Sequence, residues 1–135
     1  MNTQKQVMEI HHIGFISKNI EKDTFIYEQL GYKTIGDLVT DTVQNNYLRF
    51  MKNIHDDNLI ELICPINENS SVKNAKEGLH HICYQVDDLN KIIDIIQRNK
   101  LGTVFTKTIQ APAFNNRKII FCYLKNKTII EYLER

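Results

Sequence analysis

The sequence predicts an α+β chain built from two βαβββ modules, and the main observation behind this prediction is an internal repeat. Residues 10–14 (IHHIG) reappear as residues 79–83 (LHHIC), so that His12 and His81 lie 69 positions apart. Later in each half, a short apolar segment carries one acidic residue, Glu61 in LIEL and Glu131 in IIEY, 70 positions apart. Two anchors that agree within one residue over this distance indicate a duplicated module.

The first module is expected over about residues 8–65. Residues 9–17 are rich in Ile, His and Phe and predict a strand. Asn19 is expected to cap the following helix, because its short side chain accepts hydrogen bonds from free backbone N–H groups. Gly31 is expected to end that helix in a left-handed conformation. The expected apolar stripe consists of Ile20, Ile26, Tyr27 and Leu30, and the expected later strands are residues 32–39, 46–51 and 58–64, with a polar turn at 53–58.

The second module is expected over about residues 79–134, after a polar segment at residues 65–78 that marks the boundary. A strand at residues 79–86 precedes a helix that begins at Asp88, 69 positions after Asn19. Gly102 is expected to end this helix. The expected apolar stripe consists of Leu89, Ile92, Ile93 and Ile96, and the expected strands are residues 103–108, 118–124 and 128–133, with a loop at 109–117 around Pro112.

Composition limits the classes of function. Seventeen Lys and Arg residues against sixteen Asp and Glu residues give a formal net charge of +1, which argues against a nucleic-acid-binding surface. No apolar run approaches the roughly 20 residues of a membrane span, so no membrane association is expected. Residues 1–7 are polar and lack an apolar h-region, so no secretory signal is expected. The three cysteines lie far apart within apolar runs, which is typical of buried free thiols and favours a reducing, cytoplasmic setting.

The repeated His and Glu residues are the candidate chemical groups. If the two modules pair with pseudo-twofold symmetry, two imidazoles and two carboxylates converge on one point, a donor set that suits Zn²⁺, Ni²⁺, Co²⁺ or Mn²⁺. Taken alone, a strand His is more often a core residue, and a strand Glu more often faces solvent. Each Glu, however, has apolar neighbours on both sides, where a carboxylate is costly unless paired or metal-bound. The matched recurrence therefore favours a metal site.

The motifs around these residues resemble those of the vicinal oxygen chelate superfamily, which includes glyoxalase I, methylmalonyl-CoA epimerase, extradiol dioxygenases, fosfomycin-resistance transferases and bleomycin-binding proteins. The resemblance covers nearly the whole chain and is carried by HIG at residues 12–14, GLHHIC at 78–83, IEL at 60–62 and IE at 130–131. It implies one domain over residues 1–135, in which paired βαβββ modules form a metal-lined cleft, usually in a homodimer.

The resemblance also implies roles for individual residues. The metal ligands become His12, Glu61, His81 and Glu131, and the choice of these two His over the neighbouring His11 and His80 rests mainly on it. Glu131 is implied as the catalytic base, because family members use this position as a weak or displaceable ligand. Glu61 is implied as the group that acts on the other face of the substrate. The loop residues implied to contact the substrate are Phe114, Asn115 and Arg117, although Arg117 equally suits a solvated strand end.

The resemblance leaves two enzymatic branches open, a glyoxalase I (lactoylglutathione lyase) type and a methylmalonyl-CoA epimerase type. Both move a proton next to a metal-polarised carbonyl, of a hemithioacetal or of a thioester. The epimerase's second Glu has only Asp41 or Gln44 as counterparts here, and the Asp-Pro-Asp-Gly turn of glyoxalase I is replaced by residues 125–127 (KNK). The alternatives are a metal-free drug-binding protein of the bleomycin-resistance type, which typically lacks the ligand set, and a metal-dependent thiol transferase, whose set has one Glu.

Overall fold

A computed structural model describes residues 8–135 of the chain, so the expectation that residues 1–7 hold no secretory signal lies outside the described residues. The chain divides into two compact units. One unit is residues 12–80, and the other is residues 81–135 together with residues 8–11. Each unit holds one helix and a mixed sheet, which confirms the predicted α+β fold of two βαβββ modules.

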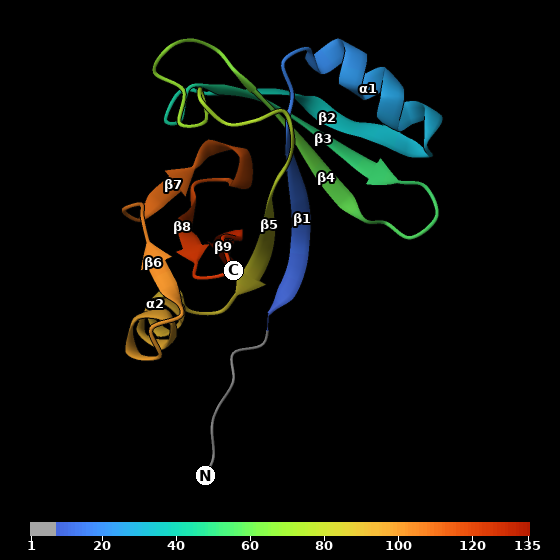
Figure 1. Ribbon diagram of the computed structural model, residues 1–135. Helices are drawn as coiled ribbons and strands as arrows, with labels where there is room; N and C mark the ends of the chain where they lie inside the picture. The colour runs from blue at the N-terminus through green and yellow to red at the C-terminus, as the bar shows by residue number, and fades with distance from the viewer. Residues whose placement is uncertain (1–7) are drawn as a thin grey trace. The chain divides into compact units, whose positions relative to one another are not determined.

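Module one forms a four-stranded sheet in the order β2-β3-β4-β1 (Figure 1). The parallel pairing of β1 with β4 is flanked by antiparallel pairings of β4 with β3 and of β3 with β2. All four strands lie within two residues of the expected bounds. The elements are β1 (Glu9–Ile16), α1 (Ile20–Gln29), β2 (Tyr32–Asp41), β3 (Asn46–Asn53) and β4 (Leu59–Pro65).

Helix α1 begins and ends as predicted, but its apolar stripe is different. The Asn19 side chain accepts a hydrogen bond from the Lys22 backbone N–H at 3.1 Å, and Gly31 has a φ of +95°. Ile20 and Tyr27 pack against a sheet core of Met51, Ile60 and Leu62. The prediction was wrong for Ile26 and Leu30, which are 43% and 65% exposed. The face of α1 that meets the sheet is narrower than its apolar composition indicates, and Thr24 is its one buried residue.

Module two repeats this order, with β5-β9-β8-β6 in its sheet and β7 paired to β8. Strands β5 and β9 are parallel, as β1 and β4 are in module one. A strand was predicted at residues 103–108, but β6 ends at Val104. Beyond it, the Phe121 backbone N–H donates to the Thr106 hydroxyl and not to a backbone carbonyl of a neighbouring strand. The expected loop at 109–117 also contains regular structure. The elements are β5 (Gly78–Val86), α2 (Leu89–Arg98), β6 (Gly102–Val104), β7 (Ile109–Ala111), the 3₁₀ turn η1 (Pro112–Phe114), β8 (Arg117–Leu124) and β9 (Ile129–Glu134).

Helix α2 packs on its sheet with the predicted stripe. Leu89, Ile92 and Ile96 are buried, and Ile93 packs against the same core. The Asp88 carboxylate accepts from two backbone N–H groups, those of Asn90 and Lys91.

The prediction that Gly102 ends α2 was wrong. Helix α2 ends at Arg98, and Lys100 takes the left-handed conformation, with a φ of +54°. Gly102 serves strand pairing instead, because a Cβ there would lie 2.4 Å from the Tyr123 carbonyl oxygen. In the part of the chain that the structure describes, neither helix has the length and hydropathy needed to cross a bilayer.

Candidate functional site

In module one, His12 and Glu61 lie side by side on one face of the sheet. Strand β1 runs parallel to β4 with Gly14 opposite Glu61, so His12, two residues before Gly14, points to the same face as Glu61. Their Nε2 and Oε1 atoms are 3.3 Å apart. His12 is completely buried and Glu61 is 5% exposed.

Module two contains an equivalent pair. Strand β5 runs parallel to β9 with Cys83 opposite Glu131, and His81 precedes Cys83 by two residues. The Nε2 atom of His81 lies 3.0 Å from the Oε1 atom of Glu131, and both residues are buried. The same strand pairing, register and spacing therefore place one His and one Glu together in each module. These are the four residues that the sequence predicts as metal ligands.

A repeated aromatic residue accompanies each pair, and the sequence reasoning missed it. Phe50 of β3 lies opposite Glu61, and Phe121 of β8 lies opposite Glu131. Each Phe ring meets the imidazole of its own module edge to face, with centroid distances of 6.0 Å to His12 and 5.4 Å to His81. The sequence contains a matching spacing that could have revealed them, since Phe50 precedes Glu61 by eleven positions and Phe121 precedes Glu131 by ten.

Burial restricts what each pair can do. A buried carboxylate requires a charged, hydrogen-bonding or metal partner, because an isolated buried charge is strongly disfavoured. Apolar residues surround the module-two pair, where Ile119, Leu133 and Phe121 form a buried cluster. A His–Glu ion pair satisfies this requirement within each module, and so does coordination of a metal ion.

The donor set fits a divalent metal ion. Zn²⁺ and related ions bind His nitrogen and carboxylate oxygen at about 2.0–2.2 Å, which places two neighbouring ligand atoms about 3 Å apart. The nitrogen–oxygen separations of 3.3 Å and 3.0 Å match this spacing. Both His residues present Nε2 to the carboxylate, which leaves Nδ1 for orienting contacts.

Strand alternation predicts that the other repeated His residues, His11 and His80, point to the opposite faces of their strands. His11 is partly buried and packs edge to face on Phe114, with ring centroids 5.2 Å apart. Phe114 ends the turn η1 and also packs against the buried cluster around Cys83 and Ile119. The predicted substrate residue Phe114 therefore packs against the buried module-two cluster that includes Phe121.

The two remaining predicted substrate residues have defined positions. Asn115 is in a left-handed conformation with a φ of +56°, directly after η1. The Arg117 guanidinium donates to the Glu134 carbonyl oxygen at 2.9 Å and to the Gln85 side chain at 2.8 Å. These hydrogen bonds hold β8 to the ends of β9 and β5, which is a structural use of the guanidinium.

Asp41, a candidate counterpart of the epimerase's second Glu, and Arg49 of β3 both make structural contacts. The buried Asp41 carboxylate accepts the backbone N–H groups of Val43 and Gln44 at 2.9 and 3.0 Å, which fixes the turn between β2 and β3. Arg49 donates to Glu21 and Thr24, which joins β3 to α1. Asp41 is therefore the acceptor that fixes this turn, through its Oδ1 atom.

Comparisons with solved structures agree on the fold. A hypothetical protein from Bacillus halodurans C-125 is 21% identical, with a TM-score of 0.77 over 95% of this chain and 94% of that one. Methylmalonyl-CoA epimerase from Mycobacterium tuberculosis is 17% identical, with a TM-score of 0.75 over 93% and 86% of the two chains. Methylmalonyl-CoA epimerase from Streptomyces coelicolor in complex with 2-nitronate-propionyl-CoA is 19% identical, with a TM-score of 0.73 over 93% and 95%.

Sequence comparison identifies the family. No curated protein matches this sequence. A family model described as Glyoxalase/Bleomycin resistance protein/Dioxygenase superfamily matches residues 11–121, which include most of β1, both helices and most of β8. The matched region contains His12, Glu61 and His81, and it ends before Glu131. The chain belongs to the glyoxalase/bleomycin resistance protein/dioxygenase superfamily.

Proposed function

We propose that this protein is a metal-dependent enzyme that moves a proton on the carbon next to a carbonyl group. The observation that carries the proposal is the matched pair of buried His and Glu side chains, His12 with Glu61 and His81 with Glu131, one pair in each module. Both modules retain this buried pair although their helices differ in what they bury, which supports a shared use of the two pairs. Shared ligation of one ion accounts for the recurrence.

A divalent ion held by the four residues would polarise a substrate carbonyl and so acidify the neighbouring C–H bond. Glu131 would accept that proton, and Glu61 would deliver a proton to the opposite face of the carbon. The imidazoles of His12 and His81 would remain neutral ligands. Phe50 and Phe121 cover the two His–Glu pairs with apolar rings, which strengthens electrostatic interactions by excluding water.

The substrate class we propose is a thioester, as in the epimerase branch. Several solved structures with this fold are methylmalonyl-CoA epimerases, and one contains methylmalonyl-CoA, which supports this choice. We also propose that the protein acts as a homodimer in the cytoplasm, and that Phe114 and Asn115 contact the substrate.

A hemithioacetal is the second candidate substrate, as in the glyoxalase I branch. One observation favours it. Asp41 is a possible counterpart of the epimerase's second base, but its carboxylate accepts hydrogen bonds from the Val43 and Gln44 backbone N–H groups. Both branches use the same proton transfer, so the substrate decides between them.

Metal analysis tests the ligand set. Purified protein dialysed against Zn²⁺, Ni²⁺, Co²⁺ or Mn²⁺ should retain about one equivalent of at least one ion. His12→Ala and His81→Ala should each weaken binding by about 100-fold or more, because each removes a direct ligand. If wild-type protein retains less than about a tenth of an equivalent of every ion, the metal proposal is wrong. Such a result would favour a metal-free binding protein of the bleomycin-resistance type.

Proton exchange tests the base. Metal-loaded protein should wash deuterium from D₂O into a methylmalonyl thioester, and turnover of a methylglyoxal–thiol adduct instead would select the glyoxalase branch. Glu131→Gln should lower the exchange rate by about 100-fold or more. Metal content is measured on the same samples, because Glu131 is also a proposed ligand. Unchanged exchange and unchanged metal content in Glu131→Gln would remove Glu131 from both roles.

A further inference from the structure

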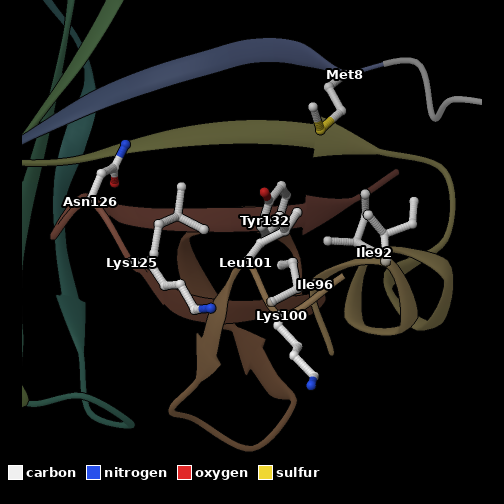
Figure 2. Close-up of a pocket in the computed structure, with 10 residues that line it drawn as sticks. Met8, Ile92, Ile96, Lys100, Leu101, Lys125, Asn126 and Tyr132 are labelled. Carbon is white, nitrogen blue, oxygen red and sulfur yellow. The ribbon is translucent and has the colours of Figure 1, made fainter. Parts of the chain in front are cut away.

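An apolar pocket lies in module two, between helix α2 and the turns that follow α2 and β8. This apolar pocket has a volume of about 650 Å³, within the usual range for small-molecule sites. Ile92 and Ile96 line it from α2, and Tyr132 lines it from β9 (Figure 2). The His–Glu pair of module two does not line it, because Glu131 and Tyr132 are successive strand residues with opposite orientations.

Lysines also line this apolar pocket. Lys100 and Lys125 line it, and the same two residues also line an adjoining depression of about 630 Å³ together with Lys127. None of the residues that line either space is Asp or Glu. Within residues 8–135, none of these three ammonium groups forms an ion pair with a carboxylate. The lining of the two spaces therefore combines apolar side chains with three positively charged ones.

Backbone hydrogen bonds hold this arrangement in place. The Leu101 N–H donates to the Ile96 carbonyl at 2.9 Å, and the Lys125 N–H donates to the Leu101 carbonyl at 2.9 Å. The Lys127 N–H closes the β8–β9 turn on the Leu124 carbonyl at 2.8 Å. The lysine backbones are thus fixed beside the apolar wall, while their side chains reach solvent.

We propose that this region binds a single-chain amphiphilic anion, with an aliphatic chain against Ile92, Ile96 and Leu101 and an anionic head between Lys100 and Lys125. Charge complementarity selects an anion, because the lining offers ammonium groups without competing carboxylates. The apolar wall selects an aliphatic body, whose burial supplies most of the affinity. A fatty acid anion is the simplest ligand with both properties.

Titration calorimetry of the metal-loaded full chain with monomeric dodecanoate tests this proposal. Saturable binding is expected, and dodecanol, which has the chain without the charge, should bind about tenfold more weakly. The double variant Lys100→Gln/Lys125→Gln should lose about tenfold in affinity for dodecanoate. Leu101→Gln should lose a similar amount, and it should fold normally because Leu101 is 44% exposed.

Lys91→Gln is the matched control, since Lys91 lies on α2 but lines neither space, and it should bind like wild type. Equal affinity of the double variant and wild type would overturn the proposal, as would equal binding of dodecanol. Binding to anionic vesicles without binding to free dodecanoate would contradict the proposed ligand and identify a membrane surface as the partner. If dodecanoate does not bind and sedimentation shows that Leu101→Gln abolishes a dimer, the partner of this region is a second copy of the chain.

Discussion

The two modules contain the same His–Glu pair and the same adjacent Phe, yet their helices bury very different surfaces. Helix α2 places Leu89, Ile92 and Ile96 in a core with residues of β5, β8 and β9. Helix α1 buries Thr24 alone and leaves Phe25 and Leu30 more than 60% exposed. Duplication has therefore retained the strand register that positions the pairs, while the outer helical layer has diverged.

The difference between the two helices shows that the strands tolerate less sequence change than the helices do. A one-residue slip in register would turn His12 or Glu61 to the other face of its sheet, so the strands tolerate little change. A helix on the outer face needs only enough apolar contact to cover the sheet. The remaining apolar side chains of α1 are free to serve another contact, and a subunit interface is one such use.

The largest expected difference in the free energy of unfolding comes from making the same Ile→Ala substitution in each helix. Ile96→Ala in α2 should lower the free energy of unfolding by about 2–5 kcal/mol, because it leaves a cavity in a packed core. Ile26→Ala in α1 should change it by about 0.5 kcal/mol or less, because Ile26 is 43% exposed. Urea unfolding of both variants measures the difference. Equal losses would show that α1 is buried in solution.

Alkaline pH should act on module two through Cys122, whose counterpart in module one is the non-titrating Met51. Burial raises the pKa of the Cys122 thiol from 9.0 to about 11. The folded state therefore disfavours the thiolate, so this stability is complete below about pH 9 and is lost as the pH rises to about 11. The loss is roughly 2–3 kcal/mol for a shift of this size.

Guanidinium unfolding across that pH range measures this loss, with Cys122→Ala as the comparison. The variant should show a shallower decline with pH than wild type. Parallel declines would assign the alkaline instability to other groups such as Tyr132, whose pKa burial raises to about 12.

The helix caps should differ by a smaller amount. Asp88 accepts two backbone N–H groups and adds a negative charge at the N-terminus of α2, whereas Asn19 accepts one on α1. Asp88→Ala should lower the free energy of unfolding by about 1–2 kcal/mol, and Asn19→Ala by about 0.5–1 kcal/mol. Urea unfolding at low salt gives both values, and Asp88→Asn separates the charge from the hydrogen bonds. A larger loss for Asn19→Ala would reverse the ranking.

The smallest effect is expected at Leu30, which is 65% exposed and corresponds by the 69-residue repeat to Asn99 at the end of α2. Leu30→Asn should change the free energy of unfolding by less than about 0.5 kcal/mol. Analytical ultracentrifugation of the same variant tests whether the exposed apolar side chains of α1 support the proposed dimer. Weakened dimerisation with unchanged stability would assign an interface role to α1, and unchanged dimerisation would exclude Leu30 from it.

Much of the architecture of this molecule follows from its sequence. The repeat predicted two βαβββ modules, and the spacing of His12, Glu61, His81 and Glu131 predicted that equivalent residues share equivalent environments. The N-caps Asn19 and Asp88 and the apolar stripe of α2 were also predicted. These features are local or periodic, because capping depends on adjacent N–H groups and strand orientation alternates with every residue.

Other features depended on tertiary contacts. Helix α1 has enough apolar residues for a wide stripe, but only its packing on Met51 and Ile60 decided which of them are covered. Phe50 and Phe121 were assigned to the His–Glu pairs only by the antiparallel register of the neighbouring strands. Thr106 interrupts a strand because its hydroxyl meets the Phe121 N–H, a contact between residues fifteen positions apart. Sequence alone determined which residues recur, and tertiary structure decided which surfaces meet, because burial depends on partners that are distant along the chain.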